Sequence, residues 1–177
     1  MLVETPRLLL RHWRESDGEA FYQLNSDPRV MEFFPKCLTR EESDALIARA
    51  EAHFETNGFG PFAAEFRQAG ELAGFIGLSV PRFEAYFTPC VEIGWRLAHR
   101  FWNQGLATEG ATAVLQFAFG PLKLPEIVSF TVPANLRSRR VMEKIGLLYD
   151  GEFDNPELPE GHELRRHVLY RRAAKPR

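Results

Sequence analysis

Residues 100–110 read Arg100-Phe101-Trp102-Asn103-Gln104-Gly105-Leu106-Ala107-Thr108-Glu109-Gly110, and this stretch decides the fold. From Leu106 to Phe119 apolar residues recur at helical spacing, which predicts a buried helix. Before the stretch, residues 91–97 alternate with period two, as in a strand. A strand, a glycine-containing loop and a helix N-terminus in this order predict an anion site, because the first N–H groups of a helix lack partners within it.

This loop differs from two well-known phosphate-binding loops. It has no Gly-Lys-Ser/Thr at Walker-type spacing, and Gly105 and Gly110 do not fit the dinucleotide pattern G-x-G-x-x-G. Gly105 lets the backbone approach a ligand closely, and the small Ala107 leaves the helix mouth open. On spacing alone, an ordinary strand-to-helix turn that contains a glycine is the alternative.

Length and composition are those of an ordinary globular protein. The 177 residues, 45% hydrophobic and 26% charged, indicate one domain spanning residues 1–177. A net charge of -2 gives no sign of a nucleic-acid partner, and no apolar run approaches the ~20 residues of a membrane span. Cys37 and Cys90 lack metal-binding spacing, so we expect free thiols and no metal site. Without a signal-peptide pattern, the chain is expected to be cytoplasmic.

Local signals along the chain predict further helices and strands. Three more helices carry N-terminal caps, and glycines end two of them. These caps are Ser16 with Glu19, Thr39 with Glu42, and Asn135, and the ends are Asn57-Gly58 and Gly146. Strands are expected at residues 7–11, 62–66, 72–80, 91–97, 126–132, 148–153 and 163–171, with a hairpin turn at Gln68-Ala69-Gly70.

The central loop resembles the acyl-CoA pyrophosphate loop of the GNAT superfamily of N-acetyltransferases, Arg/Gln-x-x-Gly-x-Gly/Ala. Trp102-Asn103-Gln104-Gly105-Leu106-Ala107 lies on that pattern, with Trp102 in place of the usual Arg or Gln. The segment from Asn135 to Gly146 resembles the family's Asn-x-x-Ser/Ala…Glu-Lys-x-Gly-Phe. Three more segments resemble the ribosomal-protein-alanine N-acetyltransferase branch: Thr5-Pro6-Arg7-Leu8-Leu9-Leu10-Arg11, Asp27-Pro28-Arg29-Val30-Met31 and Glu92-Ile93-Gly94-Trp95.

The resemblance covers essentially the whole chain and implies the GNAT acyl-CoA N-acyltransferase fold. This is an α/β fold with a mixed, splayed, roughly seven-stranded sheet flanked by about four helices. Acetyl-CoA would lie in a cleft between the strand ending near Leu97 and the strand ending near Val132. The residues expected to bind it are Trp95, Leu97, Asn103, Gln104, Gly105, Leu106, Ala107, Thr108 and Asn135.

Acetyl transfer to an amine needs a proton acceptor, because the α-amino group has a pKa of about 8 and only its neutral form attacks a thioester. Glu92, on the strand beside the expected cleft, is the candidate acceptor, and a solvated carboxylate or structural ion pair is the alternative. Many family members use a tyrosine to protonate the departing thiolate, but Met142 occupies that position here. Ser138 is the candidate substitute, with first-turn capping as its alternative.

Together these residues predict an acetyl-CoA-dependent N-acetyltransferase that works by direct transfer. Its acceptor would be a primary amine, either a protein or peptide N-terminus or a small molecule. The alternative function is a non-catalytic acyl-CoA-binding or regulatory module of the same fold, and nucleotide binding is a third reading. We expect a monomer or homodimer whose partners are acetyl-CoA and the amine acceptor.

Overall fold

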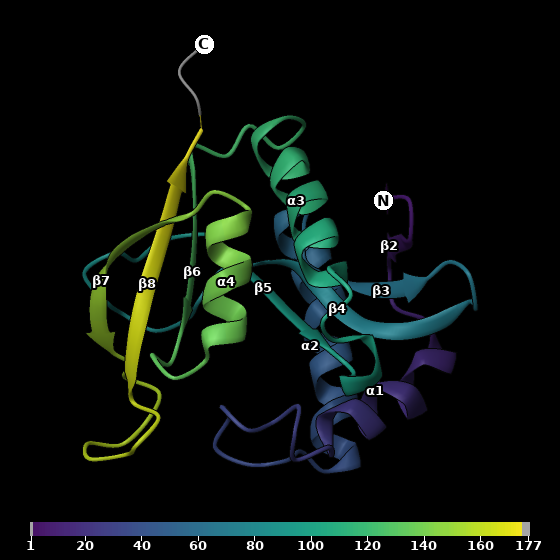
Figure 1. Ribbon diagram of the computed structural model, residues 1–177, viewed down its shortest axis with the longest axis horizontal. Helices are drawn as coiled ribbons and strands as arrows, with labels where there is room; N and C mark the ends of the chain where they lie inside the picture. The colour runs from purple at the N-terminus through teal and green to yellow at the C-terminus, as the bar shows by residue number, and fades with distance from the viewer. Residues whose placement is uncertain (1, 175–177) are drawn as a thin grey trace.

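The computed structural model describes residues 2–174, which form one mixed sheet flanked by helices (Figure 1). The strands run in the order β1-β2-β3-β4-β5-β6-β8-β7, and only the β5–β6 pair is parallel. The strands in this range are β1 (Val3–Glu4), β2 (Leu8–Arg11), β3 (Pro61–Phe66), β4 (Glu71–Ser79), β5 (Glu92–Leu97), β6 (Glu126–Thr131), β7 (Leu148–Asp154) and β8 (Arg166–Ala173). The helices are α1 (Gly18–Asn25), α2 (Arg40–Asn57), α3 (Leu106–Phe119) and α4 (Leu136–Lys144), with short 3-10 turns at Glu15–Asp17 and His99–Phe101.

Figure 1 shows α3 and α4 in front of the sheet and α2 behind it. Along β5, Ile93 and Leu97 are buried in the main core together with residues of α3 and α4, among them Val114 and Met142. Because side chains alternate across a strand, Glu92, Gly94 and Arg96 lie on the opposite face of β5. No helix within residues 2–174 has the length and apolar character needed to cross a bilayer.

Several predicted helix boundaries are confirmed. Helix α3 spans Leu106–Phe119, as its apolar spacing predicts. Thr39 caps α2 in a capping box with Glu42, and Gly58 ends that helix in the left-handed conformation with φ 73°. The amide oxygen of Asn135 accepts a hydrogen bond from the Ser138 N–H and so caps α4.

The predicted cap of the first helix is wrong. Ser16 is exposed within a 3-10 turn, and α1 begins only at Gly18, with Asp17 as its N-cap residue. Asp17 cannot cap the helix with its carboxylate, because that group accepts hydrogen bonds from the Arg11 guanidinium and the Arg14 N–H. The Asp17 side chain is therefore used in an ion pair with Arg11 and a turn with Arg14 instead of a helix cap.

The sheet also differs from the prediction at both ends. The described residues form eight strands rather than roughly seven, because the short β1 pairs with β2 and places Val3 opposite Leu10. The last strand begins at Arg166 instead of residue 163. There the Asn155 N–H donates to the Arg165 carbonyl at 2.8 Å, which closes a loop before β8 starts.

The two halves of the sheet separate between β5 and β6. These strands share a single ladder pair, Glu92 with Val128, whereas β4 and β5 pair along six residues. Beyond that pair, the Ser129 hydroxyl donates to the Ile93 carbonyl at 2.8 Å. This side-chain bond stands where a regular sheet would continue its backbone ladder. The predicted splay therefore exists, and it opens one edge of β5.

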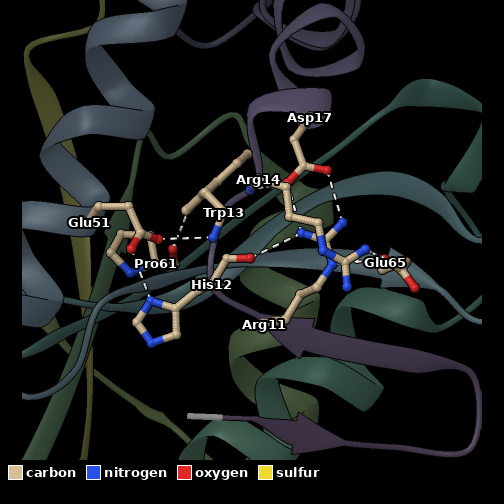
Figure 2. Close-up of polar contacts among 8 residues, drawn as sticks. All are labelled: Arg11, His12, Trp13, Arg14, Asp17, Glu51, Pro61 and Glu65. Carbon is tan, nitrogen blue, oxygen red and sulfur yellow. Dashed lines mark hydrogen bonds and ion pairs between the residues drawn. The ribbon is translucent and has the colours of Figure 1, made fainter.

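A buried ion-pair network ties the segment after β2 to the rest of the fold (Figure 2). Arg11 donates to both Asp17 carboxylate oxygens, at 2.7 and 2.8 Å, and its Nε donates to Glu65 on β3 at 2.7 Å. Arg11 and Asp17 are each only 4% exposed. Burial alone would raise the pKa of Asp17, but the hydrogen bonds from Arg11 and Arg14 outweigh burial and lower that pKa.

We expect Asp17→Asn to lower the free energy of unfolding by about 3 kcal/mol at pH 7, because it leaves a buried guanidinium without its bidentate partner. The pKa of Asp17 is depressed in the folded state, so its contribution is present above the unfolded value of about 3.9 and is lost as pH falls through the folded value. Urea denaturation from pH 7 downward should show the difference between variant and parent shrinking in acid.

Asp44→Asn is the matched control, because Asp44 pairs with Arg40 on the exposed surface of α2. Exposed pairs contribute about 0–1 kcal/mol, so this control should unfold almost like the parent. Equal losses in both variants would contradict a special contribution from the buried pair.

Candidate active site

A cavity of about 870 Å³ lies where β5 and β6 separate. Its walls come from β5, the N-terminal turn of α3, β6 and α4, together with the loop between α1 and α2 and the loop before β8. Residues far apart in the sequence therefore meet here because the sheet opens. Of the residues predicted to bind acetyl-CoA, eight line the cavity: Trp95, Leu97, Asn103, Gly105, Leu106, Ala107, Thr108 and Asn135.

Gln104 is the predicted residue that does not line the cavity. Its side-chain amide donates to the Arg100 carbonyl at 2.8 Å, and its own carbonyl accepts a hydrogen bond from Arg7. Gln104 is exposed on the outer side of the turn, so its side chain supports the loop instead of facing the cavity. The pattern around Gly105 predicts the loop, but it does not reveal which side chains turn inward.

The N-terminus of α3 forms an anion cradle at the cavity wall. Gly105 is the N-cap residue with φ 78°, a conformation that suits glycine, and Asn103 adopts φ 58° before it. The first hydrogen bond of the helix runs from the Glu109 N–H to the Gly105 carbonyl at 3.0 Å. The N–H groups of residues 106–108 therefore have no partner inside the helix, and the helix dipole adds partial positive charge to them.

The N-terminal segment holds this cradle in place. Arg7 donates from Nε to Glu109 at 2.7 Å and from Nη1 to the Gln104 carbonyl at 2.8 Å. The Thr5 hydroxyl donates to Glu109 at 2.6 Å. Burial would raise the pKa of Glu109, but these hydrogen bonds outweigh it and lower that pKa. The Thr5-x-Arg7 pattern thus has a physical role, which is to fix the first turn of α3.

Trp102 occupies the position where the loop pattern has Arg or Gln. Its indole Nε1 donates to the Leu97 carbonyl at 2.8 Å, which joins the start of the loop to the end of β5. The Arg137 guanidinium carbon lies 4.5 Å from the centroid of its ring, a cation–π distance. The substitution therefore keeps the loop attached to the strand beside it.

Glu92 points its carboxyl group into a poorly solvated part of the cavity. The Ser79 hydroxyl donates to Glu92 Oε2 at 3.3 Å, and no Lys, Arg or His of residues 2–174 forms an ion pair with it. Burial raises its pKa to about 8, while the Ser79 hydrogen bond acts in the opposite direction. Glu92 is half-buried, and the structural ion pair considered from the sequence is not present among residues 2–174.

Ser138 lies in the first turn of α4, on the opposite wall of the cavity. Its backbone N–H is the group that Asn135 caps, at 3.2 Å, and its hydroxyl has no hydrogen-bond partner among the described residues. The cap is therefore made by Asn135, which also donates to Thr131 at 3.0 Å. Met142, one turn further on, is 1% exposed and belongs to the core.

Two cavity residues carry chemistry that the sequence analysis did not assign. Arg96 lies on the same face of β5 as Glu92, and its Nη1 donates to Asn25 at 2.7 Å. His167 on β8 lies within hydrogen-bonding distance of the Arg165 carbonyl, at 3.0 Å from Nδ1, and burial lowers its pKa. The alternation of side chains along β5 could have indicated that Arg96 lies on the same face as Glu92. No feature of the sequence distinguished His167 from the other histidines. The described residues contain no cluster of three or more His, Cys, Asp or Glu suited to a metal ion.

Comparisons with known proteins agree with this geometry. The family described as "Acetyltransferase (GNAT) domain" matches residues 7–148. The "Uncharacterized N-acetyltransferase YnaD" of Bacillus subtilis is 32% identical over 165 residues, 92% of this chain and 91% of that protein. A GNAT acetyltransferase structure from Bacillus anthracis superimposes with a TM-score of 0.81 at 29% identity and covers 98% of both chains.

The fold is shared more widely than the sequence. A ribosomal-protein-S5-alanine acetyltransferase from Vibrio fischeri has a TM-score of 0.78 at 17% identity, over 99% of this chain and all of that one. The ribosomal-protein branch suggested by the sequence motifs is thus present among the structural neighbours. With the cavity, the cradle and the matched domain taken together, the chain belongs to the GNAT family of acetyltransferases, enzymes that transfer the acetyl group of acetyl-CoA to an amine.

Proposed function

We propose that this protein acetylates a primary amine directly within the cavity at the β5–β6 splay, with Glu92 as proton acceptor and Ser138 as proton donor. The observation that carries the proposal is that a half-buried carboxyl group without an ion-pair partner and a hydroxyl group without a hydrogen-bond partner line the same cavity from different walls. The α3 cradle lies at that cavity too, so one space could receive both substrates.

The cradle and the open edge of β5 fit the two chemical parts of acetyl-CoA. The free N–H groups of Leu106, Ala107 and Thr108 suit the pyrophosphate, because they combine hydrogen-bond donors with the positive end of a helix dipole. The edge of β5 at Trp95–Leu97 lacks a neighbouring strand and suits the amide groups of the pantetheine arm. Acetyl-CoA supplies the acetyl group as a thioester.

Glu92 is suited to remove a proton from an amine. Its pKa of about 8 lies close to that of an α-amino group, also about 8, so proton transfer between them is nearly balanced in free energy. An ordinary exposed glutamate, with a pKa of about 4.3, would be a far weaker base. Water could carry the proton between the amine and the carboxylate.

Ser138 is suited to deliver a proton on the α4 side. As the nitrogen–carbon bond forms and the carbon–sulfur bond breaks, the departing thiolate needs a proton, and Met142 cannot donate one. Neither cysteine lines the cavity, and burial raises the pKa of Cys90 to about 11. This supports direct transfer instead of a covalent acyl-cysteine.

The remaining expectations are also part of the proposal. We expect residues 1–177 to act as one N-acetyltransferase domain. The single sheet that contains all eight strands of the described residues supports this expectation. The net charge of -2 favours a protein without a nucleic-acid partner. We also expect a cytoplasmic monomer or homodimer.

The parent protein should bind acetyl-CoA in calorimetry and gain thermal stability by mass action, whereas Gly105→Val should bind it much more weakly. A valine at φ 78° is strained, so the backbone of the cradle should shift, and its Cβ would lie 3.6 Å from Arg7 Nη2, in the side chain that supports the loop. Gly58→Val is the control, because Gly58 has φ 73° at the end of α2, outside the cavity lining. Equal acetyl-CoA affinity in Gly105→Val and the parent would place the pyrophosphate elsewhere.

Glu92→Gln should lower kcat/KM by about 10²–10⁴-fold near pH 8, where the Glu92 carboxyl group of the parent is ionised enough to act as a general base. The loss should shrink in alkaline solution, where more of the acceptor amine is already neutral. Steady-state rates between pH 7 and alkaline conditions test this prediction. A defect of constant size across that range would assign Glu92 to substrate positioning.

Thermal unfolding gives an independent control on the Glu92 carboxyl group. Its folded pKa is raised above the unfolded value, so the folded state retains a proton that the unfolded state releases between about pH 4.3 and 8. The parent therefore loses stability across that window, and Glu92→Gln should gain on it as pH rises. No such relative gain would mean that the carboxyl group is well solvated.

Ser138→Ala should lower kcat without changing acetyl-CoA affinity, because a proton donated to the leaving thiolate acts chiefly in the transition state. Its stability should stay close to that of the parent, since the α4 cap uses the side chain of Asn135 and the backbone of Ser138. Rapid-mixing and steady-state kinetics, together with calorimetry, separate these effects. If Ser138→Ala has the same kcat as the parent, Ser138 is not the proton donor.

The alternative function is tested on the parent protein. If the parent binds acetyl-CoA but acetylates no amine, the protein is a binding module.

A further inference from the structure

Arg96 is a half-buried cation that no carboxylate of residues 2–174 neutralises. Its Nη1 donates to Asn25 Oδ1 at 2.7 Å, but its buried Nε has no hydrogen-bond partner. No Asp or Glu of residues 2–174 pairs with Arg96, and burial alone lowers its pKa to about 10, so it remains charged at neutral pH. A buried charge without a partner is costly, so proteins keep one where a ligand completes the pair.

A second cavity arginine shows the contrast. Arg137 on α4 pairs with Glu32 at 2.7 Å, so its charge is already balanced within the protein. The same pair joins α4 to the loop between α1 and α2, which carries Phe33 and Phe34. Arg96 therefore stands out as the unbalanced guanidinium on the β5 wall of the cavity.

The surroundings of Arg96 leave the edge of its guanidinium for a ligand. The guanidinium carbon lies 4.1 Å from the centroid of the Phe34 ring and 5.6 Å from that of Phe75. These rings hold the group in position by cation–π contact, while hydrogen bonds form in the guanidinium plane. Nε is enclosed by protein atoms, whereas Nη2 has no acceptor among the described residues and is the donor that can reach a ligand carboxylate.

Gly94 lies between Arg96 and Glu92 on the same face of β5. A Cβ atom added to Gly94 would meet only Glu92 Oε1, at 3.9 Å, so the strand has no side chain here that would obstruct a ligand. Glu92 and Arg96 are four residues apart, and at about 3.3 Å per residue their Cα atoms are separated by roughly 13 Å. A small molecule with an amine at one end could reach from one side chain to the other.

We propose that the acceptor is a small amine that also carries a carboxylate, with the carboxylate bound by Arg96 and the amine directed over Gly94 toward Glu92. This inference rests on the proposed function and specifies its substrate. The Phe34 side of the cavity encloses Arg96, which favours a small acceptor over a folded protein. Arg96 is the unpaired cation on the β5 wall beside Glu92, whereas Arg140 and Lys144, which also line the cavity, lie on α4.

The test measures kcat/KM with acetyl-CoA for pairs of acceptors that differ only in a carboxylate or carboxamide group. The panel contains the common α-amino acids, β-alanine, 4-aminobutyrate, 5-aminovalerate and 6-aminohexanoate, each beside its amide. The parent should prefer the carboxylate form of its best acceptor by about 10- to 100-fold, the range of a hydrogen bond to a charged group. Arg96→Met should bring this ratio close to one, with the KM for acetyl-CoA unchanged.

Two further variants keep the outcome clear. Arg96→Lys retains the charge but not the planar guanidinium that the aromatic rings hold in position, so its ratio should fall between those of the parent and Arg96→Met. It replaces Arg96→Met in the test if that variant fails to fold. Arg29→Met is the matched control, because Arg29 is exposed on the same loop as Phe34, pairs with Asp27 and does not line the cavity. Its ratio should equal that of the parent.

The possible failures are distinguishable. Acetylation without a carboxylate preference, or a preference that survives in Arg96→Met, overturns the Arg96 proposal and leaves the acetyltransferase function standing. If no amine is acetylated, the proposed function fails. Calorimetric titration of the same carboxylates and amides into the CoA complex then tests whether Arg96 binds a carboxylate. Carboxylate binding lost in Arg96→Met supports the site, and equal binding of acid and amide overturns it.

Discussion

The divergence of β5 from β6 is the constraint on which the rest of this structure depends. One ladder pair, Glu92 with Val128, joins two halves of a sheet that otherwise pairs continuously. Had the ladder continued, the edge of β5 would be paired and the cavity filled. Ser129 makes the opening stable, because its hydroxyl satisfies the Ile93 carbonyl where β6 turns away. The helices that begin beside the gap, α3 and α4, then direct their N-terminal turns toward it.

A loop that binds an anion with backbone groups must be held rigidly, and here the support comes from the far end of the chain. Arg7 and Thr5 precede β2, yet they hold Glu109 and the Gln104 carbonyl. Trp102 supplies a second anchor by donating to the Leu97 carbonyl. A negative residue in the first turn of α3 suits the helix dipole, and its pairing with Arg7 limits repulsion of an incoming phosphate.

Burial shifts the charged groups of β5 in opposite directions. It raises the pKa of Glu92 to about 8 and lowers that of Arg96 to about 10, because each lacks a partner of opposite charge. The two groups lie on one face of the strand and are separated by Gly94. An amine that also carries a carboxylate has the complementary pattern, so one uninterrupted strand face could orient the acceptor and receive its proton.

Sequence alone determined the local elements and the family. Short-range preferences of neighbouring residues can be predicted from the sequence. They account for the helix Leu106–Phe119, the Thr39 cap and the loop around Gly105. Only the tertiary structure decided that the Asp17 carboxylate pairs with Arg11 instead of capping α1, and that Gln104 lies on the outer side of its turn. It also decided that Glu92 and Arg96 are half-buried without ionic partners among residues 2–174, because burial and pairing depend on residues distant in sequence that folding brings together.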